Sequence, residues 1–197
     1  AETRRALLVA AKRVLDKGGF GALQVGAIAR AARVAHGTFY VHFATKEELM
    51  DELLALWGKR LQERLAPALG LRSSSLEATV KNAAGIFLDH LAEHRSLLEC
   101  HAQRALAGVD MATARDGLLP ALSTWIEGVL ALAIGTSLST EVRLYTHALL
   151  AMWLRVALHY LFGEGVTRAQ AIRTLVVLST GAVSAILASH KKRGKPS

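Results

Sequence analysis

The chain has 197 residues, of which 52% are hydrophobic, so it can bury a sizeable core. Its single cysteine, Cys100, excludes an intramolecular disulfide, and no signal-peptide pattern opens the sequence, so we expect a reducing, cytoplasmic setting. The sequence contains no glycine-rich phosphate loop, nucleophile elbow or zinc-ligand motif of known spacing, and we therefore expect no catalytic residue, cofactor or metal.

The net charge of +8 is concentrated near the ends of the chain. Residues 1–46 hold eight basic and two acidic side chains, residues 47–189 hold twelve basic and fourteen acidic, and residues 190–197 add four basic ones. A basic segment joined to a near-neutral body is typical of a nucleic-acid-binding module with a separate sensing or pairing domain. The alternative is a basic protein whose charge only serves solubility.

Three short helices are predicted in the basic segment, near residues 3–17, 24–31 and 35–41. The first has an apolar stripe at helical spacing and ends at Gly18 and Gly19. In the second helix, Ile28 and Ala32 lie on one face. In the third helix, Phe39 is the apolar anchor, and Phe43 follows the helix as a second one. A tight turn between the second and third helices makes a helix-turn-helix.

The exposed positions of this segment carry hydroxyl, imidazole and cationic groups and no carboxylate. Such a surface is suited to lie against phosphates and base edges, so we predict contact with double-stranded DNA. The candidate residues are Arg33, His36, Gly37, Thr38, Tyr40, His42 and Lys46.

The same segment resembles the DNA-binding signature of the TetR family of bacterial transcriptional repressors, over roughly residues 3 to 54. The matching positions are Ile28-Ala29, Ala32, Val34, Gly37-Thr38-Phe39-Tyr40, His42-Phe43, Thr45-Lys46-Glu47 and Leu49. The resemblance implies an all-α fold of about nine helices. It also implies a DNA-binding domain over 1–46 and an effector-binding and dimerisation domain over 47–197 with a basic tail.

Three positions depart from the family's pattern. Arg33 stands where the turn usually has glycine, and a left-handed backbone there would cost about 1–2 kcal/mol. Ala35 replaces the hydroxyl residue that caps the recognition helix, at a cost of about 1 kcal/mol. Gln24 replaces the hydroxyl residue that would start the second helix. Ala35 and Gln24 are counted among the candidate DNA-binding residues.

Capping boxes at Thr45–Glu48, Ser74–Glu77 and Thr167–Gln170 predict the starts of three later helices. The first of these helices is long, and Pro67 and Gly70 are expected to close or kink it. Further helices are expected over 96–107, 119–134, 139–162 and 167–190.

Lys46 is predicted to be the first residue of the fourth helix, where a cation opposes the helix dipole by about 0.3–1 kcal/mol. We interpret it as a phosphate ligand that acts together with the helix amides. The alternative is a solvated lysine balanced by Glu47 and Glu48.

The last two helices carry more apolar surface than a small body can bury. A membrane span is the competing interpretation, but the uncharged run Thr174–Ser189 has 16 residues, fewer than the roughly 20 needed. We predict that two subunits pair these helices into a four-helix bundle, which resembles how the family dimerises. The candidate interface residues are Met152, Val156, Tyr160, Leu178, Ala182, Ala185 and Ile186.

Aromatic and imidazole side chains at inward-compatible positions of the body indicate a small-molecule site for a lipophilic effector. The alternative for each is plain core packing, and a weaker alternative is a soft-metal cluster of His90 and His94 near Cys100 and His101. The candidate effector-binding residues are Trp57, Leu61, Phe87, His90, His94, Trp125, His147 and Trp153.

Two functions remain. The leading hypothesis is a ligand-responsive regulator, a repressor, that binds a palindromic operator as a homodimer and is released by its effector. The alternative is a helical binding protein whose basic head makes non-specific nucleic-acid contacts. They differ in the ratio of specific to non-specific DNA affinity.

Overall fold

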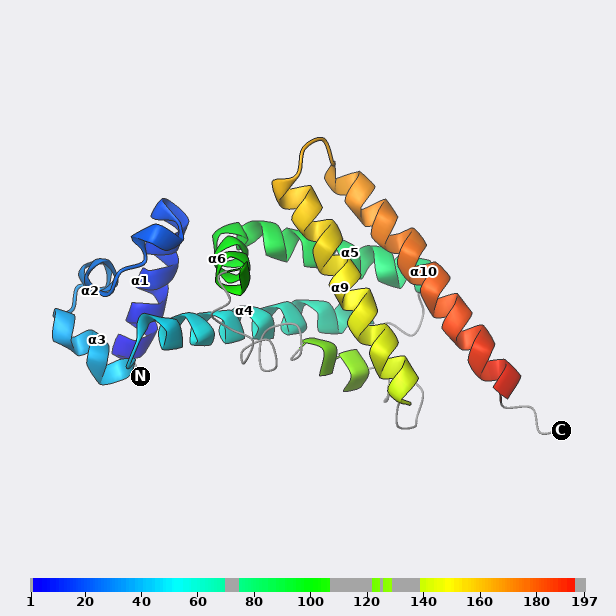
Figure 1. Cartoon of the computed structure of the whole chain (residues 1–197), viewed down its shortest axis with the longest axis horizontal. Coiled ribbons are helices and arrows are strands. Elements are labelled where there is room, and N and C mark those ends of the chain that lie inside the picture. The colour runs from blue at the N-terminus through cyan, green and yellow to red at the C-terminus, as the bar shows by residue number, and fades with distance from the viewer. Residues whose placement is uncertain (1, 70–74, 107–121, 125, 129–138, 194–197) are drawn as a thin grey trace. The chain divides into compact units, whose positions relative to one another are not determined.

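The computed structural model describes residues 2–69, 75–106, 122–124, 126–128 and 139–193 (Figure 1). Helices are the only regular secondary structure in these ranges. The all-α prediction is confirmed. The chain divides into two compact units, the first comprising residues 1–59 and 94–118 and the second residues 60–93 and 119–197. No helix in the described ranges is long and apolar enough to cross a membrane.

In the first unit, α1 (Glu2–Gly18) packs against α2 (Val25–Ala32), the 3-10 helix η1 (Phe20–Ala22) and α6 (Arg95–Leu106). The helix α3 (His36–His42) packs on α2. The side chains at the centre of this core are almost wholly inaccessible to solvent, and they include Leu7, Leu15, Leu23, Ile28, Phe39, Phe43 and Leu49. The three-helix head is thus built around one apolar core.

The contact of α6 with α1 was not predicted. Ser96 on α6 donates a hydrogen bond to the carboxylate of Asp16 on α1, which also accepts from Lys12 at 2.6 and 2.8 Å. Burial alone would raise the pKa of Asp16, but the hydrogen bonds from Lys12 and Ser96 outweigh it and hold the pKa below its usual value. A segment from beyond the predicted DNA-binding domain therefore packs against it.

Two of the three predicted capping boxes are confirmed. At the start of α4 (Lys46–Leu69), Thr45 Oγ1 accepts from the Glu48 amide at 3.1 Å, and Glu48 accepts in return from the Ala44 amide at 2.7 Å. At the start of α10 (Arg168–Arg193), Thr167 Oγ1 accepts from the Gln170 amide, and Gln170 accepts from the Thr167 amide.

The predicted box at Ser74–Glu77 is wrong by one residue. The helix α5 (Leu76–Glu93) begins one residue later, because the hydroxyl of Ser75 accepts from the amide of Ala78 at 3.2 Å. Adjacent serines are equally good caps, so the sequence pattern alone does not choose between them.

Pro67 lies inside the last turn of α4 and does not close it. The missing proline amide leaves only the carbonyl four residues earlier without its helical donor, and that residue, Glu63, is exposed to water. Of the two residues predicted to close or kink the helix, Pro67 therefore does not close it, and the helix ends at Leu69, before Gly70.

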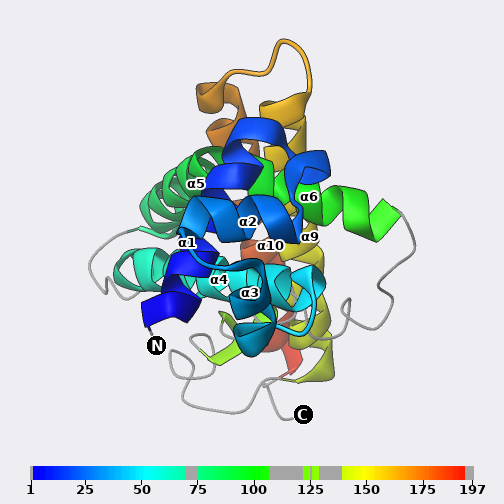
Figure 2. The same ribbon diagram turned by 90° about the vertical axis from the view of Figure 1, so that its left-hand side faces the viewer.

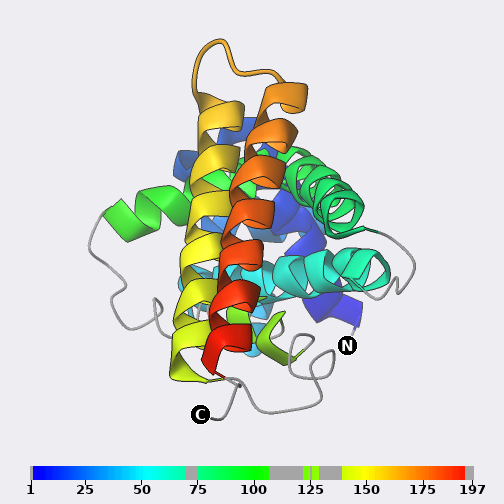
Figure 3. The same ribbon diagram turned by 90° about the vertical axis from the view of Figure 1, so that its right-hand side faces the viewer.

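In the second unit, α10 packs against α5 and against α9 (Thr140–Phe162), and α9 and α10 lie side by side (Figure 3). Trp153 on α9 connects the three helices. Its Nε1 donates to Ser179 Oγ on α10 at 2.8 Å, and its ring lies 5.4 Å from the Phe87 ring on α5. The predicted helix over 119–134 falls mostly outside the described residues, of which 122–124 and 126–128 are helical.

Arg33 ends α2 in the left-handed conformation that the sequence suggested, with φ 57° and ψ 42°. The amide of Val34 donates to the Ala29 carbonyl at 3.0 Å, and the amide of Arg33 to the Arg30 carbonyl at 3.1 Å. This is the bonding pattern of a Schellman motif, which favours glycine at the left-handed residue. The turn between α2 and α3 therefore holds a strained arginine.

We predict that Arg33→Gly raises the free energy of unfolding by about 1 kcal/mol, because glycine adopts this backbone without the side-chain clash. Arg30→Gly is the matched control, since the same change within α2 should lower stability by about 1 kcal/mol. Urea unfolding of the full chain measures both. Equal destabilisation by the two variants would contradict the strain at Arg33.

Candidate nucleic-acid interface

The helix-turn-helix is formed by α2 and α3, which face the viewer in Figure 2. The helix α3 has only seven residues, and a helix of this length is not stable by itself in water. It is fixed by Phe39 and Phe43, whose rings are buried with centroids 5.8 Å apart. The opposite face of α3 is thereby held outward.

Arg4 on α1 ties the end of α3 to the start of α4. It donates to the carbonyl of His42, the last residue of α3. Its Nε lies 3.0 Å from a carboxylate oxygen of Glu52, and its Nη2 lies 3.8 Å from Glu48. Its guanidinium carbon lies 4.1 Å from the centroid of the Phe43 ring, within the range of a cation–π contact. The hydrogen bonds that Arg4 donates to Glu52 raise the pKa of Arg4 above its usual value.

The predicted DNA-binding residues all lie at the surface of α2, α3, the turn between them and the start of α4. No carboxylate is within ion-pair distance of their basic groups in the ranges that the structure describes. His36 and Tyr40 stack against each other, with ring centroids 5.6 Å apart. The exposed residues are Gln24, Arg33, Ala35, His36, Gly37 and Tyr40, and the half-buried ones are Thr38, His42 and Lys46.

Two of these residues occupy helix starts without capping them. Gln24 and Ala35 precede α2 and α3, and neither side chain accepts a hydrogen bond from its helix. The side-chain Nε2 of Gln24 donates instead to the Gly21 carbonyl, at 3.5 Å. The first amides of α2 and α3 are thus left to water or to another acceptor.

Lys46 is the first residue of α4, as predicted, and its Nζ lies 5.6 Å from the centroid of the Phe20 ring. The carboxylate of Glu48 is already engaged by the Ala44 amide and lies near Arg4. Glu48 is therefore poorly placed to balance Lys46, while Glu47, the other carboxylate of the alternative, is exposed and is not within ion-pair distance of Lys46 in the described ranges.

Sequence reasoning missed two residues of this surface. Arg4 was counted as free positive charge, but it is a structural tie whose partners lie 38 to 48 positions away, so no local pattern could reveal it. Val41 was passed over because it is apolar, yet it is 78% exposed on α3. Its position two residues after the buried Phe39 could have indicated this exposure.

The candidate effector residues form separate pairs. Trp57 and His94, in the first unit, have ring centroids 6.3 Å apart, and Phe87 contacts Trp153 in the second. Trp125 lies outside the described residues. The predicted inward position of His147 is wrong, because its side chain is 54% exposed and its Nε2 lies 3.3 Å from Glu127. The largely covered carboxylate of Glu127 lies beside that exposed imidazole.

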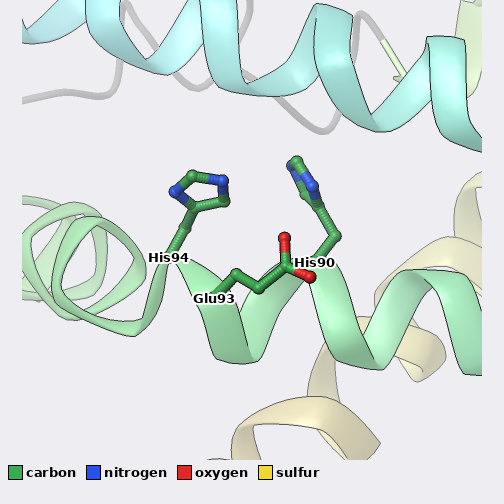
Figure 4. Close-up of side chains that lie close together, drawn as sticks. All are labelled: His90, Glu93 and His94. Carbon is green, nitrogen blue, oxygen red and sulfur yellow. The ribbon is translucent and has the colours of Figure 1, made fainter.

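A polar cluster at the end of α5 contains the buried His90, the exposed Glu93 and the half-buried His94 (Figure 4). Arg64 Nη1 lies 2.6 Å from Glu93 and 3.2 Å from His90 Nδ1. A guanidinium only donates, so His90 Nδ1 accepts and its imidazole is not protonated there. The cation that His90 and Glu93 hold in this arrangement is Arg64.

The predicted interface residues of α9 and α10 are half-buried or exposed in the single chain. Leu178 and Ala185 are exposed, and Met152, Val156, Tyr160 and Ala182 are half-buried, while the side chain of Ile186 lies outside the description. Large apolar side chains are uncovered beside them, with Leu144 67% and Val177 63% exposed. Shallow grooves on these helices are lined by residues that include Val156, Thr174 and Leu178.

Comparisons with known proteins identify this architecture. Residues 7–53 match the family model described as bacterial regulatory proteins, tetR family. A tetR-family transcriptional regulator from Streptomyces coelicolor is similar over 98% of this chain and 85% of its own, with 20% identity and a TM-score of 0.80. None of the curated protein sequences matches the chain.

Two further structures are 25% identical to the chain. A TetR-like transcriptional regulator from Rhodococcus sp. RHA1 covers 92% of this chain and 96% of its own, with a TM-score of 0.59. The multidrug binding protein EbrR, solved with imidazole, covers 90% and 95%, with a TM-score of 0.63.

The fold and the exposed face of α3 define a transcriptional regulator of the helix-turn-helix class. The head of the chain, residues 7–53, is that of the TetR family of bacterial regulatory proteins, and the chain has the fold of the TetR-like regulator structures that it resembles.

We predict that Arg4→Met lowers the unfolding temperature and weakens binding to every DNA sequence, because the end of α3 loses its tie to α1 and α4. Arg5→Met removes the same charge from the next, exposed position and should leave the unfolding temperature unchanged. Thermal unfolding and fluorescence anisotropy measure the two effects. Identical behaviour of the variants would mean that Arg4 contributes only charge.

Proposed function

We propose that the protein is a repressor that binds a palindromic operator in double-stranded DNA as a homodimer and is released by a small lipophilic effector. The observation that carries the proposal is the outward face of α3, which presents donors and no carboxylate on a head with a net positive charge. Two heads would occupy successive major grooves, roughly 34–36 Å apart. A regulator of this kind acts where the DNA is, in the cytoplasm.

The proposal divides the interface into two roles. Tyr40 and Lys46 contact phosphates, together with Arg33 and the first amides of α4, and so position α3 on the DNA. His36 and Thr38 reach base edges and so select the sequence. Because Glu48 is engaged elsewhere, Lys46 is available for a phosphate.

Pairing of α9 and α10 across two subunits would cover the apolar surface that a single chain leaves exposed. Leu144, Val177 and Leu178 are uncovered, and small residues around Ala182 and Ala185 allow helices to approach closely. A hydrophobic patch on paired helices is typical of an obligate homodimer interface.

The effector part of the proposal rests on the aromatic pairs of the body and on a relative. Phe87 and Trp153 pack against each other in the body, and a cavity opening beside such rings would have few polar groups, which favours a lipophilic molecule over a sugar or a nucleotide. EbrR is described as a multidrug binding protein and was solved with imidazole. The helix α4 is continuous from the DNA-binding head into the second unit, and an effector that moved it would change the spacing of the heads.

The competing function is a helical protein with non-specific nucleic-acid contacts. Its basic head would bind all sequences alike, and its affinity would depend only on salt. A face with two candidate base readers between phosphate ligands favours the specific reader instead.

We predict that Lys46→Ala weakens binding to all DNA sequences and lowers the slope of log affinity against log salt by about one unit, as loss of one phosphate contact requires. Lys59→Ala, an exposed lysine farther along α4, is the matched control and should leave the slope unchanged. Anisotropy titrations over a range of salt measure the slopes. If both variants keep the wild-type slope, Lys46 is not a phosphate ligand.

We predict that Leu178→Arg converts the dimer to monomers, because an unpaired charge would be buried in the helix bundle. A penalty of about 3 kcal/mol raises the dimer dissociation constant about a hundredfold. Leu76→Arg, the same change at an exposed leucine of α5, is the control and should stay dimeric. Sedimentation velocity separates the two states. A dimeric Leu178→Arg would move the interface to another surface.

A further inference from the structure

The recognition helix α3 carries one feature that phosphate contacts and polar base readers leave unexplained. Val41 is 78% exposed, the largest exposed fraction among the large apolar side chains that the structure describes. Contact with water does not stabilise an exposed valine side chain, and a polar side chain at this position would make the protein more soluble. Its neighbours on the same helix are polar or aromatic.

The geometry of α3 puts Val41 at the centre of the outward face. With 3.6 residues per turn, positions two before and two after a given residue lie about 200° around the helix, on its opposite side. The buried Phe39 therefore has Gly37 and Val41 directly opposite it. His36 and Tyr40 flank this centre on one side, and Thr38 and His42 flank it on the other.

Gly37 removes the side chain that would keep this face away from a partner. A Cβ built on Gly37 would meet no atom within 4 Å, so packing inside the head does not require glycine there. The absent side chain lets the backbone of α3 approach a groove floor closely, and Val41, one turn later, is the first side chain to reach it.

Base edges in the major groove present one apolar group, the C5 methyl of thymine. A valine placed against the other edges would strip water from donors and acceptors without replacing their hydrogen bonds, which is unfavourable. We propose that Val41 reads a thymine methyl in each half-site, and thus sets sequence preference by apolar contact. The inference rests on the proposed DNA-binding function and adds the chemical group that is recognised.

Deoxyuridine tests the proposal, because it differs from thymidine only by the missing methyl group. A duplex selected from a random library with the purified full chain would be resynthesised with deoxyuridine at each thymine in turn. We expect one position in each half-site at which the substitution weakens wild-type binding about fourfold, the value for one buried methyl group. Other thymines should tolerate it.

Val41→Ala completes the test. This variant should weaken binding to the thymine duplex and lose most of the discrimination against deoxyuridine at that one position. Val9→Ala, at a valine 45% exposed on α1, is the control and should keep the discrimination against deoxyuridine. Because Val41 is at the surface, the Val41→Ala variant should unfold at the same temperature as the wild type, which excludes misfolding as the cause of weaker binding.

Three outcomes would overturn the inference. They are a selected duplex without thymine in the contacted positions, a deoxyuridine scan without any sensitive position, and a Val41→Ala variant that keeps the full discrimination. A chain that selects no sequence at all would instead refute the proposed function. The two failures are therefore distinguishable.

Discussion

The DNA-binding head depends on the guanidinium group of Arg4, which joins α1 to the end of α3 and to α4. Arg4 sits against the ring of Phe43, donates to the last carbonyl of α3 and pairs with Glu52 on α4. A seven-residue helix contributes little stability of its own, so its orientation comes from such contacts and from the buried Phe39. Contacts on the inner face of α3 and at its end therefore determine the direction in which its outer face points.

The same contacts also determine which charged groups the head presents at its surface. Because Arg4 pairs with Glu52 and Lys12 pairs with Asp16, these two carboxylates are engaged in the packing of the head, whereas Glu47 at the start of α4 is exposed. Arg33 and Lys46 have no carboxylate within ion-pair distance in the described ranges. The outer face of α3 itself carries no carboxylate, and negatively charged DNA complements the net positive charge of the head.

Local patterns predicted the parts of the fold that local physics determines. The capping box of Thr45 with Glu48 was predicted, and the family pattern indicated a glycine-type backbone at Arg33, since each depends on residues within one or two turns. The continuation of α4 past Pro67 was not predicted, because the free-energy cost of a proline there depends on whether water can hydrogen-bond to the carbonyl four residues earlier. The exposure of His147 was missed because its partner Glu127 lies 20 positions away.

For the site, the sequence predicted the polar surface of α3 but neither the tie that orients it nor its apolar centre. Contacts such as the one from Arg4 to Glu52 join distant positions, and one sequence carries no record of them. The exposure of Val41 was within reach of a helical projection once Phe39 was taken as the buried anchor. Whether the head reads a sequence remains the central claim, and affinity for DNA alone does not decide it, since any basic head binds phosphates.

The most direct measurement is the ratio of two dissociation constants at one physiological salt concentration. One is for a fragment selected from genomic DNA with the purified chain, and the other is for unrelated DNA of the same length. A sequence-specific regulator should give a ratio of about a thousand or more. A ratio near one would contradict the account and leave a basic helical protein that binds DNA without reading it.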